Sequence, residues 1–208
     1  MIRVYDLSLK GLTVTSLAIM ARSRLRDERP VQSRKKPPEV LVSRRPRDPQ
    51  KGVLRIGNLT TRCALGKSGI GILKREGDGK TPLGAMEVLF GFYRHDHWPV
   101  MARAPWLHRV NASLGWCDAP QDINYNRAVL RPYPASHEIL ARDDILYDCV
   151  FVLNWNMKTR IRNRGSAIFM HIARENYPPT EGCIAVSKPD MIRLMRVLEP
   201  GVLIKTLA

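Results

Sequence analysis

Short apolar runs separated by turn-forming residues recur from residue 39 to the end of the chain. Runs rich in β-branched residues at 40–43 and 53–56 flank the turn-rich segment 47–52, and this pattern predicts two strands joined as a hairpin. The almost continuously apolar segment 148–153 predicts a buried central strand. This segment belongs to a strand predicted at 145–153, and further strands are predicted at 86–93, 167–173 and 202–207. The sequence therefore predicts a mostly β domain with few short helices.

One helix is predicted near the C-terminus, and Ser187 marks its start. A serine side chain caps the first free amide groups of a helix, and Asp190 suits the positive end of the helix dipole. The helix is predicted to end at Pro200 and Gly201, which commonly follow a last turn. Apolar residues recur between these limits at helical spacing, at Met191, Leu194, Met195 and Leu198.

The first 38 residues differ in composition from the rest of the chain. A modest apolar stretch at 11–21 follows basic side chains and fits a weak signal peptide, a signal anchor or a short amphipathic segment. Residues 22–38 are rich in arginine and proline, which predicts a solvated linker without a core. We therefore expect a basic N-terminal tail or anchor over 1–38 and a single domain over 39–208.

The chain is strongly basic, with 34 Lys and Arg against 19 Asp and Glu and a net charge of +15. Residues 1–50 hold 12 basic and 5 acidic side chains, so about half of the excess lies in the first quarter of the chain. Such a chain is attracted to anionic polymers, including nucleic acid, a lipid surface and an anionic cell-wall glycan. No run of 18 apolar residues occurs, which excludes a multi-span membrane protein.

Two short patterns suggest chemistry that their spacing does not support. The Gly-Asp-Gly-Lys-Thr sequence at 77–81 lacks the first glycine of a phosphate-binding loop. Residues 74–80 are therefore predicted to form a charged hairpin or loop that lines a cleft. His95 and His97 have no third ligand at a suitable spacing. This segment is therefore predicted to be a surface strand or loop, and no metal site is expected.

None of the four cysteines forms a Cys-x-x-Cys pair or a zinc-ligand spacing. If the protein is exported, one disulfide among Cys63, Cys117 and Cys149 is an open alternative that the sequence does not assign. The fourth cysteine, Cys183, follows a glycine in a segment that suits catalysis.

Residues 168–187 carry the most informative chemistry in the chain. An apolar strand delivers His171 at its end, a turn-rich connection follows, and Gly182-Cys183 opens another strand. Neighbouring strands joined in this way bring an imidazole close to a thiol, which a nucleophilic cysteine needs because only the thiolate attacks. Gly182 lets backbone amides approach a substrate carbonyl. The alternative is a small buried cysteine and an ordinary strand-end histidine.

The elements Thr81-Pro82-Leu-Gly84, His171 and Thr180-Glu-Gly-Cys183 occur in one order along the chain. With them, residues 39–208 resemble the catalytic domain of the L,D-transpeptidases, the YkuD domain family, and especially its compact proteobacterial branch. Further segments that carry the resemblance lie at 63–69, 74–80, 115–118, 125–127, 147–148 and 165–171.

This resemblance implies a β-sandwich or barrel-like fold and an enzyme that cross-links peptidoglycan. It implies that Cys183 attacks the carbonyl of the third stem-peptide residue, releases the terminal D-alanine and leaves a thioester. An amine of a second stem then takes the acyl group. The resemblance also implies that His171 acts as general base and acid, with backbone amides near Gly182 and Cys183 holding the oxyanion. It implies no metal and no organic cofactor.

The predicted substrate-binding residues have two origins. The resemblance implies that Thr180 helps to shape the turn that presents the thiol, and that Thr81 and Pro82 form a turn beside the active site. The aromatic and charged residues Trp116, Asp118, Tyr125 and Arg127 suit the lining of a peptide cleft, although ordinary packing accounts equally well for the aromatic ones.

By the same resemblance, the expected partners are peptidoglycan stem peptides and the expected location is the periplasm or cell envelope. The basic tail would contact an anionic wall or membrane surface. No specific nucleic acid is expected, because the aromatic residues are not interleaved with a basic stripe.

Three departures from the family pattern keep other functions open, and one of them is the short interval of 12 positions between His171 and Cys183. Many members carry histidine where this chain has Glu181, and arginine or asparagine where it has Ala185. The alternatives are an L,D-carboxypeptidase or endopeptidase that uses the same cysteine, and a non-catalytic wall-binding module. A basic nucleic-acid-binding protein with an inert cysteine is the rival from a different class. A carboxylate at 181 would raise the pKa of the neighbouring thiol unless its side chain points to solvent.

Overall fold

The computed structural model describes residues 38–97 and 104–208. The predicted tail lies outside the described residues except for its last residue, so the tail and its boundary stay predictions. Among the described residues, no helix is both long enough and apolar enough to cross a membrane. The elements of the described chain are β1 (Glu39–Arg45), β2 (Asp48–Ile56), β3 (Leu59–Ala64), β4 (Ile70–Gly71), β5 (Thr81–Pro82), β6 (Gly84–Tyr93), β7 (Leu107–Arg109), β8 (Leu114–Cys117), β9 (Arg127–Leu130), β10 (His137–Ile139), β11 (Cys149–Leu153), β12 (Phe169–Ile172), β13 (Ile184–Val186), α2 (Lys188–Leu194) and β14 (Leu203–Leu207).

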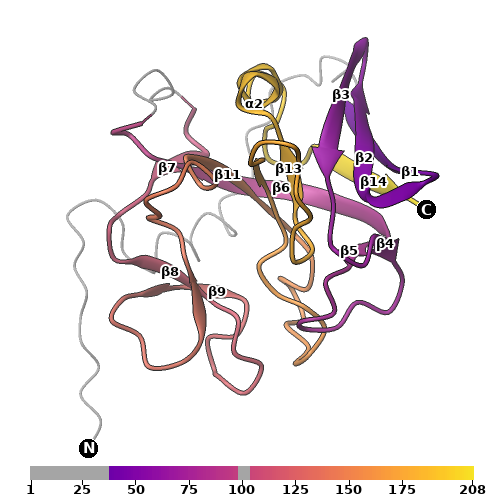
Figure 1. Ribbon diagram of the computed structural model, residues 1–208. Helices are drawn as coiled ribbons and strands as arrows, with labels where there is room; N and C mark the ends of the chain where they lie inside the picture. Colours follow the sequence, from indigo (N-terminus) through magenta and orange to yellow (C-terminus); the bar gives the residue numbers. More distant parts are fainter. Residues whose placement is uncertain (1–37, 98–103) are drawn as a thin grey trace, which may run out of the picture. The chain divides into compact units, whose positions relative to one another are not determined.

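The largest sheet closes on itself. Its strand order is β11-β12-β13-β3-β2-β1-β14-β6-β7, and β11 also pairs with β6. This extra pairing joins the first strand of the row to the last but one, so eight strands surround a core and β7 extends from β6 (Figure 1). The prediction of a mostly β, barrel-like fold is confirmed. In a closed sheet each strand has one inner and one outer face. The β-branched residues of these short strands suit such half-buried strands.

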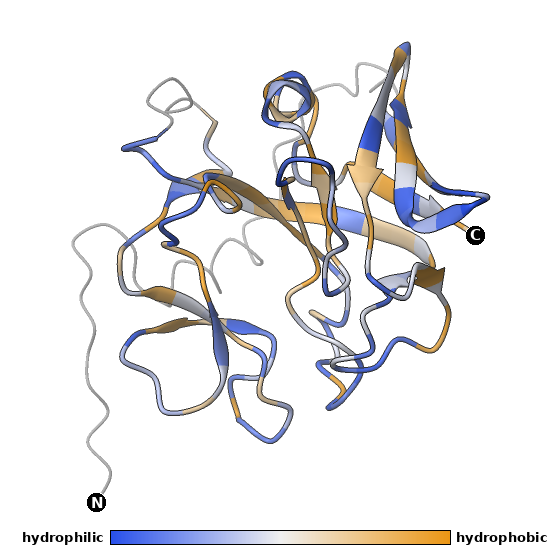
Figure 2. Ribbon diagram, in the orientation of Figure 1, coloured by the Kyte–Doolittle hydropathy of each residue, from blue (hydrophilic) through white to orange (hydrophobic). Residues whose placement is uncertain are grey.

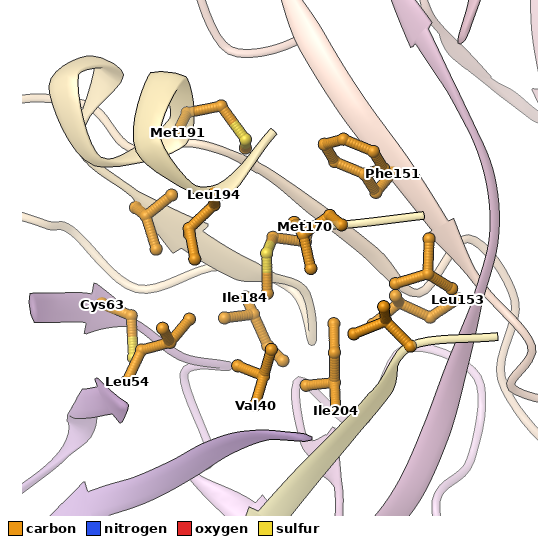
Figure 3. Close-up of a cluster of buried hydrophobic side chains, with 14 of the residues drawn as sticks. Val40, Leu54, Cys63, Phe151, Leu153, Met170, Ile184, Met191, Leu194 and Ile204 are labelled. Atoms are coloured by element: carbon orange, nitrogen blue, oxygen red, sulfur yellow. The ribbon is translucent and has the colours of Figure 1, made fainter. Parts of the chain in front are cut away.

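The inside of the barrel is filled by the apolar residues that alternate along the strands. Met170, Ile184 and Ile204 are fully buried here, and Figure 3 shows them converging with Met191 and Leu194 of α2. α2 therefore closes part of the barrel by inserting its apolar side. In Figure 2, β3 carries both orange and blue segments, as expected for a strand with one buried and one outer face.

A second apolar cluster lies on the outer face of the barrel wall. It includes Phe169, Val150 and Cys183 from the wall, together with Trp116 of β8 and Tyr147 of the segment before β11. β8 belongs to a separate three-stranded sheet, of order β10-β8-β9. The Trp116 and Phe169 rings meet edge to face at 5.3 Å between centroids. The small sheet thus contacts the outer wall beside Cys183.

The predicted helix forms, with Ser187 as its cap. Ser187 Oγ accepts a hydrogen bond from the Asp190 amide at 3.2 Å, which satisfies one of the free amides of the first turn. The α-helix ends at Leu194, earlier than the predicted limit, and continues as tight turns in which the Val197 amide donates to the Leu194 carbonyl oxygen. Leu198 is nevertheless fully buried, as its helical spacing predicts.

The clearest other differences from the predictions are three strand starts and the type of one element. β2 begins at Asp48, so the hairpin turn is shorter than the segment 47–52. The strand predicted from 145 begins only at Cys149, because residues 145–148 form a turn that the Asp148 amide closes onto the Ile145 carbonyl oxygen. The strand predicted from 167 begins at Phe169, since Ala167 has a positive φ of 50°. Thr81–Pro82 forms the short strand β5, paired with β4, and is not a turn.

Candidate active site

The strands β12 and β13 bring His171 and Cys183 to the same face of the barrel wall. They are parallel neighbours, and His171 lies opposite Ala185 in their register. Cys183 precedes Ala185 by two residues, so the alternation of strand side chains directs it to the same face as His171. The imidazole and the thiol are thus one strand apart and two residues displaced along it.

The His171 ring is held in one orientation and kept neutral. It is 4% exposed, and its Nδ1 lies 2.9 Å from the Ile172 carbonyl oxygen. A carbonyl oxygen only accepts, so Nδ1 carries the proton and Nε2 of the neutral ring offers a lone pair. Burial lowers the pKa of His171 to about 4; the hydrogen bond to Ile172 opposes this shift, and the charges of Arg142 and Arg174 contribute to it. The ring is therefore a neutral base at physiological pH.

Cys183 is also neutral in the free protein. It is 8% exposed, and its Sγ donates to the Ala167 carbonyl oxygen at 3.2 Å. Burial raises the pKa of the thiol to about 12, although a backbone hydrogen bond at Phe169 acts in the opposite direction. Within the described part of the chain, no hydrogen bond joins the thiol to the His171 ring. The resting state is thus a neutral thiol and a neutral imidazole, and not an ion pair.

The turn before Cys183 requires glycine at position 182. Gly182 has φ +137°, and a Cβ atom there would lie 2.7 Å from the Lys80 carbonyl oxygen. Thr180 Oγ1 fixes the same turn, because it donates to the Cys183 carbonyl oxygen at 2.7 Å and accepts from the Gly182 amide at 3.2 Å. Thr180 therefore positions the main chain that carries the thiol.

Thr81 supports this turn from behind. It is fully buried, and its Oγ1 accepts from the Gly66 amide at 2.9 Å and lies 3.5 Å from the Cys183 carbonyl oxygen. Pro82 is also buried, and its carbonyl oxygen accepts a hydrogen bond from the Thr206 hydroxyl. The structure thus places Thr81 and Pro82 among supporting residues and not on an open binding surface.

Charged side chains beside the thiol were not predicted as site residues. Lys74 is buried, and its ammonium pairs with Asp78 at 2.5 Å. Its charge lowers the pKa of Cys183, whereas Glu138 raises it. The predicted charged loop 74–80 does lie against the Cys183 turn, since it supplies both Lys74 and the Lys80 carbonyl oxygen near Gly182.

Tyr147 links the two proposed reactive groups. Its ring meets the His171 ring edge to face at 5.3 Å between centroids, and it packs in the same cluster as Cys183. The Arg142 guanidinium lies over the Tyr147 ring, 5.5 Å from the ring centroid. Burial and then the charge of Cys183 raise the pKa of Tyr147 well above its usual value. Tyr147 is therefore a neutral wall of the site.

Asn126 joins three segments behind the thiol and was missed by the sequence analysis. It is 1% exposed, and its Oδ1 accepts from Trp116 Nε1 at 3.0 Å and from the Ala167 amide at 3.1 Å. Its Nδ2 donates to the carbonyl oxygens of Trp155 and Asn156, both at 3.1 Å. All four hydrogen-bonding positions of the amide are used. Asn126 thereby fixes Ala167, whose carbonyl oxygen accepts from Cys183.

Replacing Asn126 by alanine is expected to lower the free energy of unfolding by about 3 kcal/mol, because several buried groups lose their partners. Its positive φ of 57° adds to the penalty, since alanine tolerates this conformation less well than asparagine. Thermal or denaturant unfolding measures the change. The matched control is Lys158→Ala, an exposed residue of the connection between β11 and β12 to which Asn126 donates, and for it we expect a change within about 0.5 kcal/mol. Equal stability of the two variants would contradict this account of Asn126.

Of the remaining predicted site residues, two are buried and two are at least partly exposed. Trp116 is 1% exposed and belongs to the packing against Phe169, which favours the ordinary packing alternative for it. Tyr125 is buried, and its hydroxyl hydrogen bonds to Glu76, which holds the 74–80 loop. Asp118 is half-buried, and its Oδ1 is shielded from solvent without a hydrogen-bond partner. Arg127 is exposed on β9.

The departures from the family pattern at positions 181 and 185 have simple local explanations. Glu181 points to solvent, with 72% of its side chain exposed, and pairs with Lys67 at 2.7 Å. It raises the pKa of Cys183 less than burial or Glu138 does. Ala185 is buried opposite both His171 and Ala64, in a row where a larger side chain has little room.

The other motifs have ordinary roles in the described residues. His95, Asp96 and His97 lie in a turn, and His97 Nδ1 pairs with the buried Asp148 at 2.5 Å. All four cysteines are free, so the open disulfide among Cys63, Cys117 and Cys149 is not formed here. In the same part of the chain, no group of three or more potential ligands is arranged to hold a metal ion.

The sequence matches a family model over residues 47–205, a span that contains both His171 and Cys183. The model is described as the YkuD, or L,D-transpeptidase catalytic, domain. The chain belongs to this family. This match confirms the predicted family resemblance. YkuD-domain proteins are enzymes that act on peptidoglycan. No curated protein matches the chain.

Several solved structures are similar to this YkuD-domain chain. Bd1075 of Bdellovibrio bacteriovorus aligns with a TM-score of 0.41 and 16% identity, over 82% of this chain and 47% of that one. The helical cell shape determining protein Pgp2 of Campylobacter jejuni aligns with 0.42 and 16%, over 82% and 48%. An L,D-transpeptidase from Mycobacterium smegmatis aligns with 0.37 and 12%, over 82% and 59%. The chain spans about half the length of the first two.

Proposed function

We propose that this protein is a peptidoglycan L,D-transpeptidase that uses Cys183 as nucleophile and His171 as general base and acid. One observation carries the proposal: a neutral imidazole with a free Nε2 lone pair shares one face of adjacent strands with a neutral thiol, inside a YkuD domain. The two groups act together, because the thiol becomes a nucleophile only when a base removes its proton, and the neutral imidazole is that base.

In the acylation step, the Cys183 proton passes to His171 Nε2 while Sγ attacks the carbonyl carbon of the third residue of a tetrapeptide stem. The resulting oxyanion needs a hydrogen-bond donor. The Gly182 amide already donates to Thr180 Oγ1, so we assign this role to the Cys183 amide. Collapse of the intermediate breaks the peptide bond, and His171 returns the proton to the departing D-alanine amine. A thioester on Cys183 remains.

In the transfer step, an amine of a second stem attacks the thioester carbonyl. His171 takes the proton that this amine loses and returns a proton to the departing Cys183 sulfur. A new amide bond forms, which is a 3-3 cross-link or a related attachment, and the free thiol is restored. Each proton that leaves one group is taken up by another, so the cycle needs no metal or redox partner to balance.

The charges around Cys183 support an amine as the acceptor. Glu138 raises the pKa of Cys183 and is close enough to Asp118 for their charges to interact. Burial and the Asp118 charge raise the pKa of Glu138, and the shielded Oδ1 of Asp118 has no partner in the described residues. Both carboxyl groups would stabilise the positive charge that develops on the nitrogen of an amine as it attacks the thioester.

The proposed substrate places the enzyme in the cell envelope, where peptidoglycan lies. The basic tail over 1–38 would then be attracted to an anionic wall or membrane surface. This location and the role of the tail belong to the proposal.

Products formed from a disaccharide-tetrapeptide decide between transfer and hydrolysis. We expect mass spectrometry to detect dimers joined through third residues, together with one released D-alanine for each dimer. The matched control is the Cys183→Ala variant, which should leave the substrate unchanged. Tripeptide without dimers would contradict transfer and support an L,D-carboxypeptidase. Binding without any product would support the non-catalytic wall-binding alternative.

A further inference from the structure

A basic cavity lies on the outer face of the barrel wall, away from Cys183. Its volume is about 240 Å³, and its lining includes Arg45, Lys51 and Arg62 together with Asn176 and Tyr177. The three cations come from the β1–β3 strands, whereas Asn176 and Tyr177 belong to the connection between His171 and Cys183. Residues far apart in sequence thus form one concave surface.

The cations of this cavity are largely uncompensated. Lys51 has one ion pair, with Asp48 at 3.4 Å. Within residues 38–97 and 104–208, neither the Arg45 nor the Arg62 guanidinium has an ion-pair or hydrogen-bond partner. Unpaired guanidinium groups that share a cavity repel each other and favour an anion with planar or tetrahedral oxygens. Among the residues that the structure describes, no carboxylate lines the cavity to neutralise these cations.

The cavity continues the face that carries the proposed active site. In the strand register, His171 lies opposite Ala185, Ala185 opposite Ala64, and Ala64 opposite Lys51. All four side chains therefore occupy one row on the outer face, and three strand spacings separate its ends by about 14 Å. Tyr177 packs on the alanines of this row and also lines the cavity. An extended chain of about four residues spans this distance.

We infer that this cavity, which we call the Arg45–Arg62 pocket, binds an anionic group, a carboxylate or a phosphate, of the wall polymer whose stem reacts at Cys183. The inference rests on the proposed function. A polymer held at Cys183 by its stem places neighbouring anionic groups within reach of the pocket. Binding there also contacts the connection that carries Asn176 and Tyr177, so the pocket serves as a second substrate subsite beside the reactive pair.

The test measures binding to the Cys183→Ala protein, which cannot turn substrate over. The probes are a disaccharide-tetrapeptide, the same compound with its carboxylates amidated, and inorganic phosphate. We expect the Arg45→Gln/Arg62→Gln double variant to raise the Kd for the disaccharide-tetrapeptide or for phosphate at least about tenfold. The matched control is Arg44→Gln/Arg55→Gln, which removes the same charge from exposed positions of the same hairpin outside the pocket.

The pattern of increases in Kd identifies the anion that binds the pocket and separates this inference from the proposed function. If amidation and the double variant weaken binding equally and not additively, the ligand is a stem carboxylate. If only phosphate binding depends on the two arginines, the ligand is a phosphate of the wall. Equal Kd values for the double variant and the control pair with every probe would overturn the inference. Acylation of Cys183 by a carbapenem, measured separately in the otherwise wild-type protein, tests the proposed function without involving the pocket.

Discussion

Replacing Cys183 by alanine is expected to lower the release of D-alanine from a disaccharide-tetrapeptide by about 10⁴-fold or more, because the variant lacks the atom that forms the thioester. The side chain contributes little volume to the packing, and its hydrogen bond to Ala167 is a weak thiol contact. The variant should therefore fold. A coupled assay for free D-alanine measures the loss, and circular dichroism confirms the fold.

Cys149 provides the matched control for this prediction. It is also a free and fully buried cysteine, and burial raises its pKa strongly, but it lies inside the barrel in the other apolar cluster. Cys149→Ala is expected to retain D-alanine release close to that of the wild-type protein. If Cys183→Ala kept more than about one hundredth of the wild-type rate, Cys183 would not be the nucleophile.

Replacing His171 by glutamine is expected to slow acylation of Cys183 by about 10²- to 10⁴-fold, the usual range for loss of a general base. The pH dependence gives the sharper result. Because burial lowers the pKa of His171 to about 4, the neutral base predominates above that pH. The acylation rate of the wild-type protein should be level from about pH 5 to neutrality and fall about tenfold per pH unit below pH 4. Stopped-flow measurement with a carbapenem gives this profile.

The pH at which the acylation rate falls distinguishes a buried, neutral His171 from an exposed histidine. A neutral pair loses activity only when acid protonates His171, near pH 4. An inflection near pH 6.5, the value of an exposed histidine, would contradict the burial of the ring. In His171→Gln the acid limb should disappear, while the remaining rate rises with pH because the thiol, whose pKa is about 12, must ionise without help.

Much of the barrel could be predicted from local pattern, and the failures have physical causes. The apolar run that became β11 and the capped helix α2 are determined by residues close in sequence. β3 was not predicted, because Thr60, Thr61 and Arg62 lack an apolar run and the strand is stabilised by pairing with β2 and β13. β11 begins later than predicted because Ile145 lies in a turn, where its side chain is exposed and does not join the sheet.

The reactive pair could be predicted, but most of its surroundings could not. His171 and Cys183 lie on adjacent strands joined by a short connection, so sequence proximity brings them together. Asn126 and Glu138 reach the site only because the β10-β8-β9 sheet packs on the outer wall, whereas Tyr147 comes from the turn before β11. That packing depends on contacts such as Trp116 with Phe169, between segments distant in sequence. Asn126 offered one signal, its position between two residues already chosen as candidates.

The central claim is that a stem peptide becomes covalently attached to Cys183. Intact-mass measurement of the full chain, quenched in acid after brief mixing with a disaccharide-tetrapeptide, tests it most directly. We predict a species heavier than the protein by the mass of the donor less one D-alanine, with the addition located on Cys183 by peptide mapping and absent from Cys183→Ala. An unmodified mass under conditions in which D-alanine is released, or an adduct on another residue, would contradict the account.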